Sequence, residues 1–306
     1  MSLNLLLLIV GFVFLVRGAD AFIDGASSLA RRFNIPEIII GLTVVAFGTS
    51  VPEFAVTLSS VLRGASGVAV GNVLGSNIVN ILLVLGVSSV LAPLPIKNKT
   101  IKYEIPFVIF ITMLLMWFGL RYGVINICGA CVLCVLFAVF VGYLYFGAQE
   151  KIKKSVKFKE MSITKMILSL VLGLAVLIFG SNLVVNSAVH IANILHVPGR
   201  IIGLTLVAFG TSLPELVTCI IAARKNHTDL ILGNIIGSNI FNILFVLGMA
   251  GLFYPIRFEY AFTIDAAISI VITTFLWLIA LYEHELTRRA GLVFLLCYIG
   301  YLVYLF

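Results

Sequence analysis

Two glutamates lie within long apolar segments of the chain, and each directly follows a proline. The sequence GLTVVAFGTSVPE ends at Glu53, and 162 positions later GLTLVAFGTSLPE ends at Glu215. Eleven of these thirteen positions are identical. A carboxylate at the centre of a membrane helix costs about 2.5–3.5 kcal/mol on insertion scales, and intramembrane carboxylates commonly mark functional sites. Two of them at matching points of a duplicated sequence indicate a cation site.

Hydroxyl groups precede each carboxylate by three and four residues, a spacing that places them on the same face of a helix. These hydroxyls belong to Thr49, Ser50, Thr211 and Ser212. The proline between hydroxyl and carboxylate lacks an N–H and bends the preceding turn, which frees backbone carbonyls. Irregular backbone at membrane depth is tolerated where it lines a cavity. We therefore expect carbonyls around residues 46–48 and 208–210, beginning at Ala46 and Ala208, to join the site.

A second duplicated motif adds amides and further hydroxyls. The sequence GNVLGSNIVN, starting at Gly71, returns as GNIIGSNIFN at the same offset of 162 residues. Its polar residues recur every four positions, on one helix face. They are Asn72, Ser76 and Asn80, with Asn234, Ser238 and Asn242. The first asparagine of each copy could equally form hydrogen bonds between helices, whereas we expect the serines and the last asparagines to line the site. The glycines let helices approach closely.

The expected ligands are all oxygens, from carboxylate, hydroxyl, amide and carbonyl groups. Calcium takes six to eight oxygen ligands in a flexible shell, which suits such a set. No histidine or cysteine pattern accompanies the motifs to favour zinc or copper. Two carboxylates would neutralise one divalent cation or partly offset several monovalent ones, and protons would compete for them. The motifs contain no nucleophile–base pair, so we expect no enzymatic activity and no cofactor.

The segments that carry these motifs are membrane spans. The chain of 306 residues is 61% hydrophobic and 11% charged, with a mean hydropathy of +1.18. Hydropathy predicts an all-α polytopic membrane protein with ten helices. The predicted spans are residues 3–30, 37–62, 67–93, 103–120, 124–146, 164–192, 198–223, 229–253, 260–281 and 290–306.

The duplication divides these spans into two groups of five. We expect a first repeat at residues 1–148, a short basic loop at 149–163 and a second repeat at 164–306. Because five spans precede the second repeat, it starts on the opposite side of the membrane, which makes the repeats inverted. Transporters with inverted repeats commonly bind their substrate near the midplane, between the repeats.

Basic residues predict the orientation of the chain in the cell membrane. Fifteen of the twenty lysines and arginines lie on the side where the first span ends, four lie on the other side, and one lies within that span. The positive-inside rule places the richer side in the cytoplasm and both termini outside. Six lysines between residues 150 and 165 form a polybasic loop of the kind attracted to anionic lipids, not to nucleic acid.

Three charged residues in the first span stand outside both motifs: Arg17, Asp20 and Asp24. Their counterparts 162 positions later are uncharged, so the duplicated site does not use them. We interpret them as an interfacial or intramolecular charge pair involving Arg17 rather than as part of an ion pathway.

The motif pairs GTSVPE/GTSLPE and GNVLGSNIVN/GNIIGSNIFN resemble the α-repeats of the calcium/cation antiporter superfamily, in particular its prokaryotic sodium/calcium exchanger-like members. The resemblance implies antiport of Ca²⁺ against Na⁺ by alternating access, with the lipid bilayer as surroundings and no protein partner. It also implies that the principal ligands are Glu53 and Glu215. The further residues implied to line the ion sites are Thr49, Ser50, Ser76, Asn80, Thr211, Ser212, Ser238 and Asn242, with the carbonyls of Ala46 and Ala208.

One position departs from the family pattern. Several relatives have an aspartate at the last position of one copy of the second motif, whereas this chain has amides at both Asn80 and Asn242. The site therefore has two carboxylates rather than three, and the coupling ion stays open between Na⁺, H⁺ and a dependence on K⁺. A passive cation channel is the alternative of a different class, which the inverted arrangement does not favour.

Overall fold

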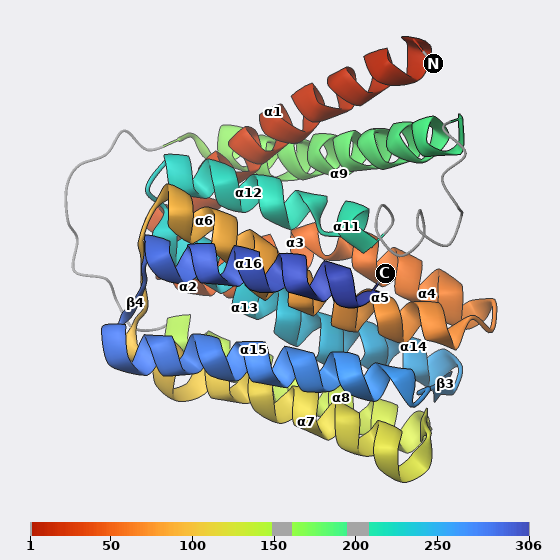
Figure 1. Ribbon diagram of the computed structural model, residues 1–306. Helices are drawn as coiled ribbons and strands as arrows, with labels where there is room; N and C mark the ends of the chain where they lie inside the picture. Colours follow the sequence, from red (N-terminus) through yellow and green to blue (C-terminus); the bar gives the residue numbers. More distant parts are fainter. Residues whose placement is uncertain (1, 149–160, 195–207, 306) are drawn as a thin grey trace.

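The computed structural model describes residues 2–148, 161–194 and 208–305 (Figure 1). Eight of the described helices are long and apolar enough to cross a membrane, and a bent pair of helices makes a ninth candidate span. The prediction of an all-helical polytopic membrane protein is confirmed. Nine of the ten predicted spans coincide with these helices. The remaining one, at residues 198–223, begins outside the described residues.

The elements before residue 149 carry the first copies of both motifs. They are α1 (Ser2–Phe33), α2 (Glu37–Ile40), the π-helix η1 (Gly41–Val45), α3 (Ala46–Thr49), α4 (Val51–Leu62), α5 (Ser66–Val79), the π-helix η2 (Asn80–Leu85), α6 (Gly86–Leu91), β1 (Leu94–Pro95), the π-helix η3 (Thr100–Glu104), α7 (Ile105–Tyr122), β2 (Val124–Ile125) and α8 (Ile127–Ala148).

The elements after residue 160 carry the second copies. They are α9 (Ile163–Ile194), α11 (Ala208–Thr211), α12 (Leu213–Arg224), α13 (Thr228–Phe241), the π-helix η5 (Asn242–Leu247), α14 (Gly248–Phe253), β3 (Ile256–Arg257), α15 (Ala261–Glu283), β4 (Glu285–Leu286) and α16 (Arg288–Leu305). α11 and α12 are the described part of the predicted span at residues 198–223.

The motif with the glutamate breaks its helix in the turn before the proline in both copies, as expected. Ser50 leaves helical geometry with φ −86° and ψ 7°, and Ser212 does so with φ −87° and ψ 3°. In the first copy the helices on either side of the break meet at 48°. The proline takes up one of the first two positions of the next helix in each copy, where its missing N–H costs little. Each glutamate thus lies in the first turn of the helix that begins after the bend.

The helices of the second motif lie at the centre of the molecule, with the longest helices outside them (Figure 1). In the span Thr228–Phe253, which contains α13, 94% of an apolar stretch of 18 residues is buried inside the protein. In the span Ile127–Gly147, which is part of α8, the buried share of such a stretch is 28%. Close packing of α13 depends on glycine, because a Cβ on Gly233 would lie 2.4 Å from the Ile38 carbonyl oxygen. The small-residue spacing therefore brings α13 against η1 in the second copy, as predicted, whereas in the first copy Gly71 and Gly75 show no such close backbone approach to the described residues.

Two long helices, α1 and α9, run side by side along one face of the molecule (Figure 1). Their backbones touch at glycines. A Cβ on Gly18 would lie 2.5 Å from the Leu177 nitrogen, and one on Gly180 would lie 2.6 Å from the Leu15 nitrogen. The described parts of the two repeats are thus joined by direct backbone packing along these helices.

Short strands join the early and late parts of the chain. β1 pairs with β4 in antiparallel register, Leu94 opposite Leu286, and β2 pairs with β3, Val124 opposite Arg257. Sequence analysis did not predict these pairs, because two residues carry no periodic signal. Each pair satisfies backbone groups where a helix of the first half ends beside one of the second half.

Candidate cation site

The two glutamates lie in the protein interior, and each accepts a hydrogen bond from the motif of the other repeat. The side chains of Glu53 and Glu215 are 0% exposed. The Ser50 hydroxyl donates to Glu215 Oε1 at 3.0 Å, and the Ser212 hydroxyl donates to Glu53 Oε1 at 3.5 Å. The bends at these serines therefore bring both copies of the first motif together. This exchange of bonds could not be read from either copy alone.

No basic side chain of the described residues pairs with these carboxylates. The two carboxylates lie in one buried cluster, because each accepts a hydrogen bond from the serine of the other motif, and there two ionised carboxylates would repel each other. Burying one unpaired charge is costly, and burying two that repel is more so, unless an opposite charge compensates them. A cation between the glutamates would supply that charge.

Nine buried side-chain oxygens have no hydrogen-bond partner among the described residues, and five of them belong to the two motifs. Leaving a buried polar group unpaired costs about 1–3 kcal/mol, so such groups are rare in folded proteins. The five atoms are Glu53 Oε2, Glu215 Oε2, Ser76 Oγ, Asn80 Oδ1 and Asn242 Oδ1. All of them belong to residues that the sequence assigned to the ion sites. Carboxylate, hydroxyl and amide oxygens are hard ligands that suit Ca²⁺ or Na⁺.

Ser238 connects the second motif to a glutamate and to the first repeat. Its hydroxyl lies 3.5 Å from Glu215 Oε1 and 3.5 Å from the Ala46 carbonyl oxygen. That carbonyl also accepts the Ser50 N–H at 3.1 Å. The expectation that the bend frees the Ala46 carbonyl is therefore wrong, although the oxygen does face the motif residues and a carbonyl has a second lone pair. Ala208 is the first residue of α11, and its role stays a prediction.

The threonine of each first motif contacts the first asparagine of the other repeat. Thr49 Oγ1 donates to Asn234 Oδ1 at 3.1 Å, and Thr211 Oγ1 donates to Asn72 Oδ1 at 3.3 Å. The Asn72 amide in turn donates to the Glu53 carbonyl at 3.3 Å. These bonds support the interpretation that the first asparagines join helices. They also hold the threonine hydroxyls at the edge of the glutamate pair.

Asn77 and Asn239 determine the orientation of the side-chain amides of Asn80 and Asn242. This role was not predicted from the sequence. The side-chain amides of Asn77 and Asn239 each donate to the other residue's main-chain carbonyl, at 3.2 and 3.4 Å. Their side-chain oxygens then accept from the amides of the last asparagines. Asn80 Nδ2 donates to Asn239 Oδ1 at 3.0 Å, and Asn242 Nδ2 donates to Asn77 Oδ1 at 3.2 Å.

This network fixes the amide orientations, because a backbone carbonyl can only accept. The nitrogen of each central asparagine must face that carbonyl, so its oxygen faces Asn80 or Asn242. Those two must offer their own nitrogens, which leaves their oxygens unpaired. The signal was present in the sequence: both copies read Gly-Ser-Asn. The four-residue period of the other polar residues does not include Asn77 or Asn239.

A π-helix starts at each of the last asparagines. η2 begins at Asn80 and η5 begins at Asn242, at the same offset of 162 residues. π-helical turns are rare and frequently occur at functional sites. Here the wider turn follows the residue whose amide oxygen stays unpaired.

The sequence matches the family described as "Sodium/calcium exchanger protein" over residues 3–146 and 165–306. It is 33% identical to the sodium/calcium exchanger MaX1 of Methanosarcina acetivorans over an alignment of 348 positions, which takes in 100% of this chain and 99% of the relative. It is 35% identical to the inner membrane protein YrbG of Escherichia coli over 295 residues, which cover 90% of each protein.

Solved structures of the sodium-calcium exchanger NCX_Mj have the same fold. One of them, soaked with Na⁺ and Sr²⁺, superposes with a TM-score of 0.88 at 32% sequence identity. The superposition covers 99% of this chain and 98% of that chain.

Proposed function

Because the chain belongs to the sodium/calcium exchanger family, we propose that it is a secondary-active antiporter that exchanges Ca²⁺ for Na⁺ by alternating access. The observation that carries this proposal is the group of five buried, unpaired oxygens that includes one from each glutamate. A bound cation would satisfy them and offset the repulsion between the carboxylates. Extracellular Na⁺ running inward would then drive Ca²⁺ out of the cell.

We propose that the ions bind at Glu53 and Glu215, with the hydroxyls of both first motifs and the serines and last asparagines of both second motifs. The carbonyl of Ala46 would contribute its second lone pair, and Ala208 would do the same in the other repeat. Six to eight oxygens complete a Ca²⁺ shell, so these groups suffice without a third carboxylate.

The proposed fold has ten helices in two inverted repeats of five. Its support is that matched features recur at one offset: the bends at Ser50 and Ser212, and the π-helices that start at Asn80 and Asn242. The cross-bonds between the motifs would then lie about a pseudo-twofold axis near the membrane midplane. In the proposed orientation both termini are extracellular and the loop at residues 149–163 is cytoplasmic.

Complete burial of the glutamates favours a carrier over a passive channel. Ions in a channel need a continuous path with weak sites, whereas Glu53 and Glu215 are enclosed. In a carrier the same site opens to one side at a time. An alternative within the carriers is exchange of Ca²⁺ against H⁺, because two carboxylates without a third can also bind protons.

Flux measurements in proteoliposomes test these proposals. We expect an inward Na⁺ gradient to drive Ca²⁺ out, with stimulation by ions on the opposite side. If a pH gradient drives Ca²⁺ transport in the absence of Na⁺, the counter-ion is H⁺ rather than Na⁺. If transport requires K⁺, the exchanger carries K⁺ together with Ca²⁺. Conductance that needs no counter-ion would indicate a channel.

Substitutions of the glutamates test the site. Glu53→Gln and Glu215→Gln each remove one charge at nearly constant shape, and both should abolish Ca²⁺ transport while the protein is still made and folded. Glu104→Gln is the matched control, because Glu104 is also buried, at 3% exposure, but belongs to η3, outside both motifs. If both glutamate variants transport Ca²⁺ at the normal rate, the proposed site is wrong.

A further inference from the structure

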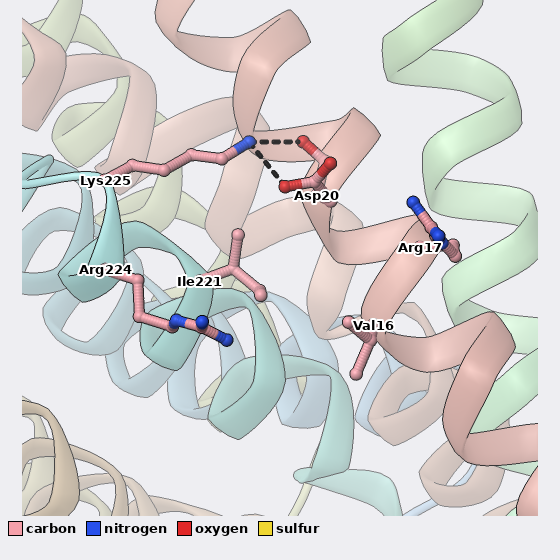
Figure 2. Close-up of a pocket in the computed structure, with 6 residues that line it drawn as sticks. All are labelled: Val16, Arg17, Asp20, Ile221, Arg224 and Lys225. Carbon is pink, nitrogen blue, oxygen red and sulfur yellow. Dashed lines mark hydrogen bonds and ion pairs between the residues drawn. The ribbon is translucent and has the colours of Figure 1, made fainter.

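A basic crevice lies between α1 and α12 (Figure 2), and neither Glu53 nor Glu215 is among the residues that line it. Its volume is about 340 Å³, within the range of about 300–1,000 Å³ usual for ligand pockets. Figure 2 shows its two arginines on different helices, one from α1 and one from α12. The lining residues are Val16, Arg17, Asp20, Ile221, Arg224 and Lys225.

Lys225 pairs with Asp20, which lines the crevice, and with Asp24 one turn further along α1, and it offsets one of their two negative charges. Its ammonium lies 2.7 Å from Asp20 Oδ1 and 2.7 Å from Asp24 Oδ1. Burial lowers the pKa of Lys225, but hydrogen bonds to both aspartates and their negative charge outweigh it and raise the pKa above its usual value. The ammonium is therefore charged at neutral pH. The prediction that these aspartates form a charge pair with Arg17 is wrong. Both pair instead with Lys225, which lies more than two hundred positions later in the sequence.

Arg17 and Arg224 add two positive charges to the one negative charge left over by Lys225 and the aspartates, so the crevice and Asp24 together keep a net positive charge. In the described ranges neither Arg17 nor Arg224 forms an ion pair or a hydrogen bond with an acidic group. Both side chains are exposed, and Val16 beside them is 44% exposed. Arg17 lies within the candidate span Leu3–Phe33, where a cation without a partner is costly. An anion that reaches the crevice from the lipid would reduce that cost.

The charged residues of the crevice and Asp24 have no charged counterpart in the other repeat except Lys225, which corresponds to Arg63. The positions 162 residues from Arg17, Asp20 and Asp24 are Phe179, Asn182 and Asn186. The position that corresponds to Arg224 is a leucine, Leu62. The motif residues recur in both halves, whereas the charges of Arg17, Asp20, Asp24 and Arg224 occur in one half only. The duplicated cation site therefore does not account for these charges.

We propose that this crevice binds the phosphate-bearing head group of an anionic phospholipid. A guanidinium presents parallel N–H donors that match phosphate oxygens, and it stacks on apolar surface more readily than an ammonium does. Basic pockets between membrane helices are suited to such head groups. The acyl chains would lie along the exposed apolar surface of α1 next to Val16. This binding is independent of the ion exchanged at the glutamates.

The test uses the purified full-length protein and native mass spectrometry. Protein in detergent is mixed with equal amounts of phosphatidylglycerol and phosphatidylcholine, and the lipid retained on the protein is counted. The wild type should retain phosphatidylglycerol in preference. Arg17→Gln and Arg224→Gln should each weaken that retention about fivefold, as expected for one basic residue at a lipid head group. Arg17→Lys and Arg224→Lys keep the charge but lose the parallel N–H donors, so their retention of phosphatidylglycerol should lie between that of the wild type and that of the glutamine variants.

Arg63→Gln is the matched control, because Arg63 is exposed at the end of α4 and lies outside the crevice. An equal loss in this variant, or an unchanged preference in the Arg17→Gln/Arg224→Gln double variant, overturns the proposal. An excess of inorganic phosphate distinguishes the binding of a lipid head group from the binding of free phosphate. If it abolishes the retention of phosphatidylglycerol, the crevice binds free phosphate and the lipid assignment is wrong; continued retention supports it.

Discussion

The amide network predicts that Asn77 controls cation affinity although its own side chain does not carry an unpaired oxygen. We expect Asn77→Leu to weaken Ca²⁺ binding, because leucine has nearly the same shape but cannot accept the hydrogen bond from Asn242 Nδ2, which measures 3.2 Å in the native protein. When Asn242 then turns its oxygen to a cation, its nitrogen is buried without a partner.

That unpaired nitrogen sets the size of the effect. A buried polar group without a partner costs about 1–3 kcal/mol, which corresponds to a dissociation constant raised roughly 5- to 150-fold. The amide can turn to relieve this cost when no cation is bound, so the penalty falls on the bound state. Asn239→Leu should act in the same way through Asn80, whose amide donates to Asn239 Oδ1 at 3.0 Å.

Equilibrium binding of radioactive Ca²⁺ to the purified protein measures these constants. Thr112→Ala is the control, because Thr112 is fully buried but donates only to the Val108 carbonyl of its own helix, at 2.8 Å. That variant reports general loosening of the helices and should bind Ca²⁺ with native affinity. Native affinity in both leucine variants, with the protein still folded, would refute the role assigned to the network.

Three further predictions concern packing, ion preference and ligand-linked stability. Gly233→Ala should lower the melting temperature sharply and reduce the yield of folded protein, because its Cβ would lie 2.4 Å from the Ile38 carbonyl oxygen; a native melting temperature would contradict the close packing. Asn242→Asp should change the ion or pH preference of transport, since it adds a third carboxylate and puts an acceptor against Asn77 Oδ1; unchanged preference would make this position structural. Saturating Ca²⁺ at a hundred times its dissociation constant should stabilise the wild type by about 2.7 kcal/mol in thermal unfolding, and Glu53→Gln should lose this gain; an equal gain in the variant would place the ion elsewhere.

The residues proposed for the ion site could be singled out from the sequence, because a carboxylate inside a membrane span has a high energetic cost. A carboxylate inside an apolar segment commonly marks a functional site, and the exact repetition of Glu53 as Glu215 indicates that both glutamates belong to one. Proline next to each glutamate marked the bend, and the bend occurs at the preceding serine in both copies. Local rules of helix geometry were sufficient for these features.

Contacts between the repeats were not predictable, because they depend on how two helices far apart in the sequence meet. The mutual bonds of Asn77 and Asn239 need the register of α5 against α13. The pairing of Lys225 with Asp20 likewise joins residues more than two hundred positions apart. A four-residue period finds one face of a helix, but it does not tell which of the neighbouring polar residues faces a partner.

The central claim is that the unpaired oxygens of Glu53 and Glu215 hold a cation together, and a crystal structure of the protein with bound Ca²⁺ tests it most directly. The anomalous signal of the ion should appear between the two side chains, with Glu53 Oε2 and Glu215 Oε2 both at about 2.3–2.6 Å, the usual Ca²⁺–oxygen distance. Crystals grown at saturating Ca²⁺ that show the ion only elsewhere, or show no ion between the glutamates, would contradict the account.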